Sequence, residues 1–257
     1  NHDDLQRVLA AGAEVFYVDH HFAGNVPPSA RLKSLINEAP DVCTSLLINH
    51  YLRGAYTAWG VVGTFGDNLK KSATGLAKNL DISGEQLSLL EKLGIYINYN
   101  GYGANLEELH FAPDQLYRLL SQYRSPFDFV ADNSADFQKL EQGYHQDIEA
   151  AQSTVALVAS DEIAAFVLPN EPWACRVSGV FSNQLANDNP QRGHAVLTVK
   201  PNGNYLVSLR APLNNKQGAA TLCRQFPTGG GRAAAAGIND LPAAMLDQFI
   251  AAFTQAY

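Results

Sequence analysis

The order of apolar and polar positions at the start of the chain predicts a helix followed by a buried strand. Residues 3–11 place apolar side chains at helical spacing. Residues 15–18 are consecutive apolar residues rich in β-formers, which is typical of a parallel strand covered on both faces. The polar residues Asp19, His20 and His21 follow at once. This order indicates an α/β fold, in which functional residues collect at the carboxyl ends of strands.

Helical spacing of apolar residues recurs through the middle of the chain. Asp41 is placed to cap a helix over residues 42–52. The segment 56–65 is apolar, but the glycines within it leave helix and strand both open. Further helices are predicted over residues 83–94, 113–123 and 136–152. The last of these is long and polar, which suits a connector between two domains.

After about residue 153 the pattern changes from helices to strands. Strands are predicted over residues 155–158, 165–168, 194–200 and 205–210. The tetrapeptide 201–204, Pro-Asn-Gly-Asn, is a strong hairpin signal between the last two. The sequence therefore predicts an α/β protein with two domains and a boundary near residue 150. The first domain would hold a mostly parallel sheet flanked by helices, and the smaller C-terminal α/β domain a mixed sheet.

Composition and charge narrow the class of protein. The chain has 257 residues, of which 46% are apolar and 17% charged, so it can bury a large core and is not a disordered chain. No apolar run approaches the ~18 residues of a membrane-spanning helix, so we expect no membrane partner. The formal net charge of -7 disfavours binding to long nucleic acid, which needs many Lys and Arg side chains. Without a leader pattern, the expected location is cytoplasmic.

The cysteines indicate the redox state of the protein, and the first residue indicates whether the chain is complete. Cys43, Cys175 and Cys223 are odd in number and far apart, so we expect reduced thiols rather than disulfides or a zinc cluster. The chain begins at Asn1, and its single methionine is Met245. We therefore expect a chain that has been trimmed or that is part of a longer protein.

Asp19, His20 and His21 are the first candidate site. Neutral imidazole nitrogens are common ligands of divalent metals, and the aspartate could ligate the metal or orient a ring nitrogen. Adjacent side chains on a strand, however, point to opposite faces. The spacing therefore also fits a polar loop start in which the histidines satisfy nearby backbone groups.

Asp67 is the second candidate, within the segment 63–68 of sequence Gly-Thr-Phe-Gly-Asp-Asn. Glycines beside a carboxylate let the backbone approach a ligand closely. The same residue types are ordinary turn formers, so a ligand and a simple turn are both open.

The third candidate is the segment 228–237, in which three glycines precede Arg232 and four alanines. Consecutive glycines leave backbone amides unobstructed, and the alanines favour a helix directly afterwards. The segment thus predicts an anion site at a helix N-terminus, with the planar Arg232 guanidinium gripping phosphate or carboxylate. The alternative is a tight turn and an alanine-rich helix packed closely on its neighbour.

The first two candidates together resemble the motifs of the DHH phosphoesterase superfamily, named after its Asp-His-His triplet. Asp19-His20-His21 matches the third motif of that family, and the Gly-Asp pair ending at Asp67 matches the fourth. The resemblance implies a two-metal site, usually filled by Mn²⁺ and open to Mg²⁺, with His20 and Asp67 as metal ligands. It also implies catalytic roles for Asp19, which supports the cluster, and His21, which faces the substrate phosphate. Two divalent ions ~3.5–4 Å apart can activate water and stabilise charge on the attacking and leaving oxygens.

The third candidate resembles the Gly-Gly-His-x-x-Ala-Ala-Gly signature of the DHH-associated C-terminal domain, which anchors the far end of the substrate. Arg232 stands where that signature has histidine; its guanidinium can bind phosphate, and the identity of the substrate stays open. The substrate-binding residues that the resemblance implies are Arg210, Gly229, Gly230, Gly231 and Arg232. For Arg210, at the end of the predicted strand 205–210, an exposed strand-end arginine is an equal alternative.

The resemblance covers residues 15–237, because the motifs occur in the family's order. It implies a DHH-type catalytic domain over residues 1–131 with its N-terminal part missing, a linker helix over 132–152, and a DHH-associated domain over 153–257. Two family motifs that precede the triplet, an Asn-x-Asp-x-Asp-like loop and a metal-bridging aspartate, have no counterpart here, since Asp3 and Asp4 lie in a predicted helix. We expect these motifs upstream of this chain. The alternative is that they never existed, which leaves a half-site.

The resemblance implies a manganese-dependent phosphoesterase that hydrolyses a small nucleotide or short oligonucleotide phosphate ester in a cleft between the domains. Long duplex nucleic acid is not an expected partner, and a homodimer is allowed. A non-catalytic nucleotide-binding or regulatory module with an incomplete metal site is the alternative from another class, and a pyrophosphatase is the third option.

Overall fold

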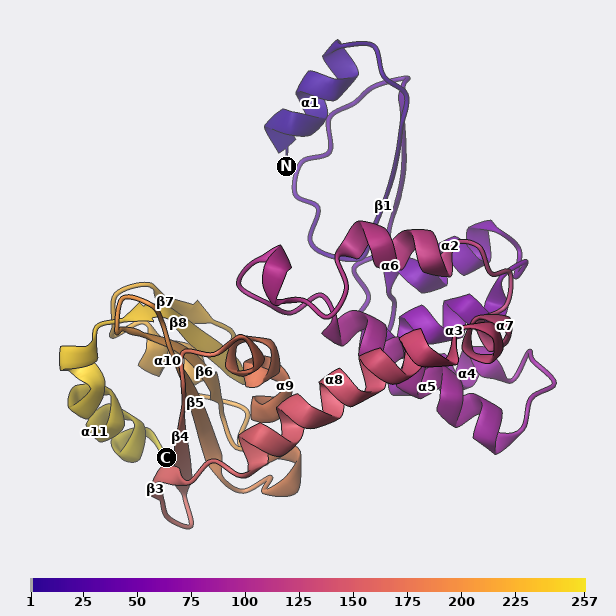
Figure 1. Ribbon diagram of the computed structural model, residues 1–257. Coiled ribbons are helices and arrows are strands. Elements are labelled where there is room, and N and C mark those ends of the chain that lie inside the picture. The colour runs from indigo at the N-terminus through magenta and orange to yellow at the C-terminus, as the bar shows by residue number, and fades with distance from the viewer. Residues whose placement is uncertain (1) are drawn as a thin grey trace. The chain divides into compact units, whose positions relative to one another are not determined.

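The chain divides into two compact units, shown together in the computed structural model of Figure 1, which describes residues 2–257. The first unit comprises Asn1–Gly101 and Pro113–Glu141, and the second comprises Tyr102–Ala112 and Gln142–Tyr257. Residues 102–112 thus belong to the second unit although first-unit segments flank them in the sequence. No helix within residues 2–257 has the length and apolar character that crossing a bilayer requires.

The first unit is mainly helical and carries a small sheet. Its elements are α1 (His2–Ala10), β1 (Val15–Asp19), β2 (Leu32–Ile36), α2 (Thr44–Tyr51), α3 (Thr57–Gly66), α4 (Lys70–Ala77), α5 (Gly84–Tyr99), α6 (Pro113–Leu120) and α7 (Pro126–Asp132). The predicted strand after the first helix is β1, and it pairs in parallel with β2 so that Asp19 lies opposite Ile36. The polar triplet therefore begins at the carboxyl end of a parallel strand. This strand is not covered on both faces as predicted, because its sheet has only two strands among the residues described and Phe16 is 42% exposed.

The second unit is built on a mixed sheet. Its elements are η1 (Leu106–Glu108), most of α8 (Ser134–Gln152), β3 (Ala156–Ala159), β4 (Ile163–Leu168), α9 (Pro172–Asp188), β5 (Gly193–Val199), β6 (Tyr205–Arg210), α10 (Ala219–Cys223), β7 (Gly229–Gly231), β8 (Ala235–Leu241), η2 (Ala243–Met245) and α11 (Leu246–Ala256). The strand order is β3-β4-β5-β6-β8-β7, with β4 and β5 parallel and the other neighbours antiparallel. The α/β class with one small parallel and one larger mixed sheet agrees with the sequence prediction.

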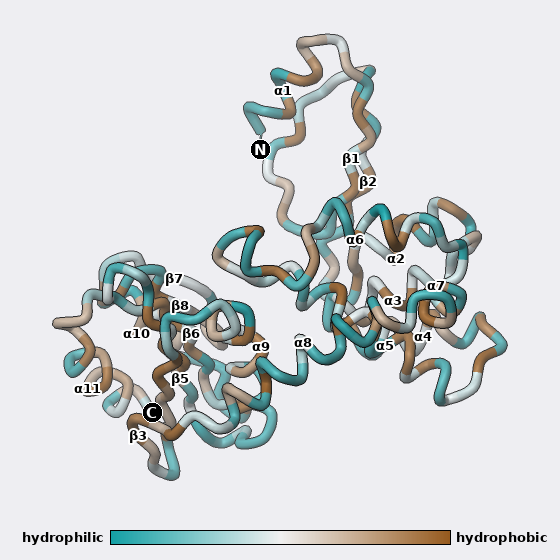
Figure 2. Tube along the Cα trace, in the orientation of Figure 1, coloured by the Kyte–Doolittle hydropathy of each residue, from teal (hydrophilic) through white to brown (hydrophobic). Residues whose placement is uncertain are grey.

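Both faces of the mixed sheet are covered by helices. Side chains alternate along β5, so Ala195 and Leu197 belong to one buried cluster with residues of α10 and α11, while Val196 belongs to another with residues of α8 and α9. This double burial explains why every residue of β4 is apolar and why the centre of β5 is an apolar run, brown in the tube of Figure 2. The alternation fixes the register of the sheet.

The ambiguous apolar segment 56–65 is a helix, and its glycines explain the choice. In α3, Gly66 faces Gly94 of α5: a methyl group on either would lie inside contact distance of the backbone of the other helix. The two helices are thus packed backbone to backbone, and α3 makes its most extensive contacts with α5. This close packing sets the position of Asp67, the next residue after α3.

We predict that Gly94→Ala destabilises the first unit by about 1–3 kcal/mol, because the new methyl group meets the Val62 carbonyl and the Gly66 amide. Gly75→Ala is the matched control, since a methyl group at Gly75 of α4 meets nothing within 4 Å. A glycine-to-alanine change in an exposed helix gains about 0.5–1 kcal/mol, so the control should be neutral or stabilising. Urea titration of both variants measures the difference, and equal stability would contradict the packing argument.

The start of α2 differs from the prediction. The helix begins at Thr44 with Cys43 at its N-cap position, and no side chain caps it, so Asp41 is not the cap. Asp41 instead accepts a hydrogen bond from the Ser72 hydroxyl through its backbone carbonyl. The Val42 carbonyl also remains outside the helix, where it becomes a partner for His20.

The glycine-rich segment does not form a turn and helix, so this prediction is wrong. Gly229–Gly231 is the edge strand β7 and pairs antiparallel with β8, which contains the alanines Ala235 and Ala236. A methyl group at Gly229 would overlap the Cys223 carbonyl, so glycine is required by close packing of the strand on α10. Pairing of β8 with both β6 and β7 overrides the helix preference of alanine, and no helix N-terminus is available to an anion here.

His194 on β5 is buried at 1% exposure, and burial, with Arg192 nearby, lowers its pKa from 6.5 to about 4. Between pH 6.5 and 4, His194 therefore binds a proton in the unfolded chain and stays neutral in the folded chain. Stability should fall as the pH drops through this window, with a slope of up to about 1.4 kcal/mol per pH unit. His194→Gln should lose that part of the slope in urea titrations at pH 4 to 7, whereas exposed His50→Gln should keep it. An unchanged slope in His194→Gln would contradict the assignment.

Candidate metal centre

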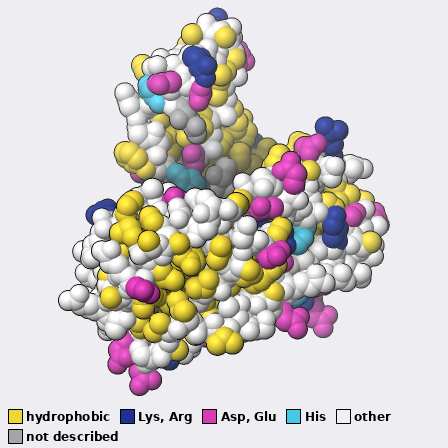
Figure 3. Space-filling model, turned by 60° about the vertical axis from the view of Figure 1, so that its left-hand side comes forward, with side chains coloured by type: hydrophobic (Ala, Val, Ile, Leu, Met, Phe, Trp, Pro, Cys, Tyr) yellow, Lys and Arg dark blue, Asp and Glu magenta, His cyan; other side chains and the backbone are white. Residues whose placement is uncertain are grey.

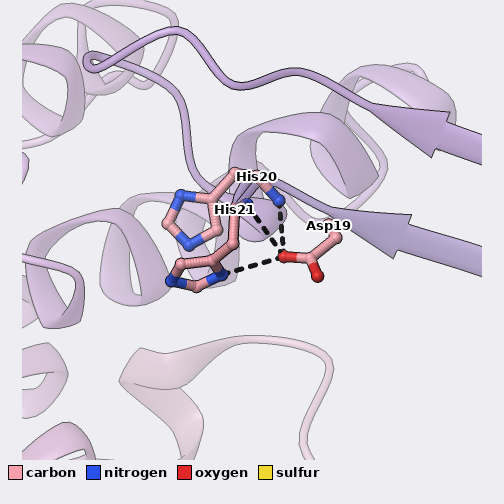
Figure 4. A group of neighbouring side chains, drawn as sticks. All are labelled: Asp19, His20 and His21. Atoms are coloured by element: carbon pink, nitrogen blue, oxygen red, sulfur yellow. Dashed lines mark hydrogen bonds and ion pairs between the residues drawn. The ribbon is translucent and has the colours of Figure 1, made fainter. Parts of the chain in front are cut away.

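Asp19 ends β1 and organises the two residues that follow it. Its Oδ1 accepts hydrogen bonds from the His20 amide at 2.7 Å, the His21 amide at 3.1 Å and His21 Nδ1 at 2.9 Å. Figure 4 shows these bonds converging on one carboxylate oxygen. The other oxygen, Oδ2, accepts from the Tyr17 hydroxyl at 2.8 Å. The hydrogen bonds from His21 above all hold the pKa of the Asp19 carboxyl well below its usual range, so it is ionised.

His20 is held in one tautomer by the backbone. Its Nδ1 lies 2.9 Å from the Val42 carbonyl oxygen. Because a carbonyl can only accept, Nδ1 donates, and Nε2 of the neutral ring keeps its lone pair. A backbone carbonyl on the second ring nitrogen is the usual support of a metal-ligating histidine. The His20 side chain is 17% exposed, so it is partly shielded from water.

Asp67 comes next to His20 through the packing of α3. It follows the last residue of α3, and Asn68 then takes a left-handed conformation with φ of 60° that ends the helix. The Asp67 Oδ2 atom lies 3.7 Å from His20 Nδ1. The structure therefore brings together His20 and Asp67, the two residues predicted to ligate a metal.

His21 and Asp19 face a different cavity from His20 and Asp67. His20 and Asp67 line a cavity of about 230 Å³ formed by residues of α2, α3 and α5, including Ser45 and Asn98. Asp19 and His21 line a second cavity of about 840 Å³ against α1. Nothing in the sequence signals Ser45 or Asn98, because both lie inside ordinary helical patterns.

The residues present fit a divalent metal ion. Among residues 2–257, Asp19, His20 and His21 form a group whose ligand atoms lie within 4.8 Å of one another. Two imidazole nitrogens and carboxylate oxygens suit first-row divalent metals, and the free Nε2 of His20 offers a lone pair. The same group offers too few carboxylates for a complete pair of ions, and Asp3 and Asp4 lie in α1, as predicted.

The predicted substrate-binding residues of the second unit gather at one end of its sheet. Arg210 pairs across β6 and β8 with Ala235, whose carbonyl accepts the Arg232 amide at 2.8 Å. The Arg210 side chain donates to Asn183 Oδ1 at 2.7 Å, and burial lowers the pKa of its guanidinium. Arg232 is exposed. Sequence reasoning missed the Asn183 contact, because no pattern singled out α9.

No protein-family model matches the sequence, and no curated protein is significantly similar to it. Solved structures do resemble it. RecJ from Thermus thermophilus, in complex with Mn²⁺, has a TM-score of 0.60 and 18% identity, and the match covers 99% of this chain and 43% of RecJ. The pGpG-specific phosphodiesterase PggH from Vibrio cholerae has a TM-score of 0.60 and 13% identity over 100% of this chain and 87% of PggH.

A DHH-domain protein described as a member of a family of ribosomal proteins gives a TM-score of 0.56 and 14% identity. The match covers 97% of this chain and 65% of that protein, so the chain spans less than two thirds of that structure and of RecJ. These likenesses extend over nearly all of the chain and include both of its units. The chain thus has the fold of the DHH-domain proteins.

Proposed function

We propose that the protein is a metal-dependent phosphoesterase that hydrolyses a small nucleotide or a short oligonucleotide phosphate ester, with Mn²⁺ as its metal. The observation that carries this proposal is the arrangement of His20: its Nδ1 donates to a backbone carbonyl while Asp67 lies beside the ring. The fold shared with RecJ and with a phosphodiesterase supports it.

In this proposal the four candidate site residues of the first unit have separate roles. His20 and Asp67 would hold the ion through Nε2 and a carboxylate oxygen. A bound divalent ion supplies charge stabilisation and activation of water for phosphoester hydrolysis. His21, whose Nδ1 donates to Asp19, directs Nε2 away from that bond. Because phosphate oxygens only accept hydrogen bonds, Nε2 would contact the substrate phosphate once it has taken up a proton. Asp19 would orient the His21 ring through its hydrogen bond to Nδ1.

We propose that the second unit binds the non-reacting end of the substrate through Arg210 and Arg232. With no helix N-terminus at Gly229–Gly231, the donors would be the two guanidinium groups and the backbone amides of the edge strand β7. The face drawn in Figure 3 carries Lys and Arg side chains as scattered groups rather than a continuous basic surface. This distribution and the net charge of -7 favour a short substrate over long duplex nucleic acid.

A substrate panel tests the proposal. The full-length protein is incubated with pyrophosphate, adenosine bisphosphate, a dinucleotide and a short oligonucleotide, with Mn²⁺, with Mg²⁺ and with a chelator. We expect hydrolysis of a phosphate ester that Mn²⁺ stimulates and the chelator abolishes. Cleavage of pyrophosphate alone would replace the proposal by the pyrophosphatase option.

A second candidate function is a non-catalytic nucleotide-binding module. It is favoured by one observation: the group Asp19, His20 and His21 contains one carboxylate, and Asp67 adds one more, which is few for a two-metal site. That function would give nucleotide binding, measured by calorimetry, without turnover in any arm of the panel.

A further inference from the structure

Tyr17 hydrogen-bonds a residue of the candidate site but has no role in it so far. It stands two residues before Asp19 on β1, and because side chains alternate along a strand, both point to the same face. Its hydroxyl donates to Asp19 Oδ2 at 2.8 Å. Tyr17 also lines the cavity that contains Asp19 and His21.

The two oxygens of the Asp19 carboxylate have different partners. Oδ1 receives both following amides and His21 Nδ1, whereas Oδ2 receives the Tyr17 hydroxyl. A carboxylate bound on one oxygen alone can rotate about its last torsion, which is broad for aspartate. The Tyr17 bond opposes this rotation and keeps Oδ1 aimed at the His21 ring.

The orientation of Asp19 in turn decides which nitrogen of His21 carries the proton. Because ionised Asp19 can only accept, His21 Nδ1 must donate to it, and Nε2 of the neutral ring keeps its lone pair. His21 itself is 72% exposed on its side chain. Its ring packs edge to face against His20, with ring centroids 4.2 Å apart, but such a contact does not select a tautomer, whereas the Asp19 bond does.

We propose that Tyr17 is a positioning residue, which fixes the Asp19 carboxylate and thereby holds His21 in the tautomer with a free Nε2. Its role in hydrolysis rests on the proposed function, but its effect on His21 does not. The substitution that isolates this role is Tyr17→Phe, because it removes the hydroxyl and keeps the ring.

Nitrogen NMR of the His21 ring, in protein without metal and at a pH where the ring is neutral, reports the tautomer directly. In Tyr17→Phe the ratio of Nδ1-protonated to Nε2-protonated rings should fall about 2- to 10-fold, the effect of one net hydrogen bond. Affinity for Mn²⁺, measured by electron paramagnetic resonance, should stay unchanged, because the proposed metal ligands are His20 and Asp67 and not His21.

Tyr51→Phe is the matched control. The Tyr51 hydroxyl accepts from Lys33 at 3.2 Å, and its ring contacts Phe16 of the same strand β1. This variant should leave both measurements unchanged. If Tyr17→Phe gives the wild-type tautomer ratio, or if Tyr51→Phe shifts it equally, the positioning role is wrong.

Asp19→Asn keeps the test decisive if Tyr17→Phe folds poorly. It removes the ionised acceptor itself, so the His21 tautomer ratio should shift at least as far as in Tyr17→Phe. An unchanged ratio in Asp19→Asn would overturn the proposal. Failure of the proposed function would look different: wild-type protein would show no metal-dependent hydrolysis while the tautomer shift persisted.

Discussion

His20→Ala should lower metal-stimulated phosphoester hydrolysis by more than about 100-fold. Removal of an outer partner of a metal-ligating histidine already costs about 10- to 100-fold, so removal of the proposed ligand itself should cost at least as much. The variant removes the ring that hydrogen-bonds the Val42 carbonyl and lies 3.7 Å from Asp67 Oδ2. Turnover is measured in the full-length protein on the substrate that the panel identifies, over a Mn²⁺ titration.

His50→Ala is the matched control for this experiment. His50 lies near the end of α2, is exposed and is remote in sequence from the triplet. It should retain wild-type turnover and wild-type Mn²⁺ affinity. Full turnover in His20→Ala, with an intact fold by circular dichroism, would remove the triplet from the active site.

Arg176→Met should lower the free energy of unfolding by about 3–5 kcal/mol, the cost of breaking a buried ion pair by removing one partner. Arg176 is 9% exposed and Asp147 4% exposed. The guanidinium donates to both carboxylate oxygens of Asp147, at 2.7 and 2.9 Å, and also to the Glu108 carbonyl. Methionine keeps most of the volume, so the loss would report the charge and its hydrogen bonds rather than a cavity.

Arg118→Met provides the comparison, because Arg118 and Asp114 form an ion pair at 3.7 Å with side chains 79% and 67% exposed. Exposed pairs of this kind contribute about 0–1 kcal/mol. Guanidinium chloride titrations of the two variants should therefore separate clearly. Similar losses would mean that the Arg176 pair is as solvated as a surface pair.

Much of the fold follows from periodicity in the sequence. The strand β1, the long polar helix α8 and the strands β3 to β6 are all predictable, because uninterrupted apolar runs and helical spacing leave few alternatives. The burial of β1 is not, since an apolar run does not show how many strands and helices will cover it. The prediction for segment 228–237 is wrong because local preference and tertiary pairing disagree there. Alanine favours a helix in isolation, but β6 and β7 both pair with β8, and that pairing determines its structure.

The sequence allows the site residues themselves to be predicted, but not the groups that hydrogen-bond them and hold them in place. The Asp-His-His triplet and Asp67 can be found because they follow apolar segments and match a spacing. The Val42 carbonyl, which holds the His20 ring, carries no signal because any residue type supplies a carbonyl. The Tyr17 hydroxyl is also missed, since a tyrosine within an apolar strand segment is read first as a packing residue.

The second unit is compact in space, but segment 102–112 is separated in the sequence from the rest of the unit. A fragment starting at residue 153, as the strand pattern suggests, would keep Arg176 but lose the Asp147 carboxylate and the Glu108 carbonyl that bind it. Such a fragment would bury a cation without those two acceptors. No single cut in the chain can therefore release this unit by itself, because residues 113–141 of the first unit lie between its two segments. A test of whether it folds alone needs a chain that includes residues 102–112.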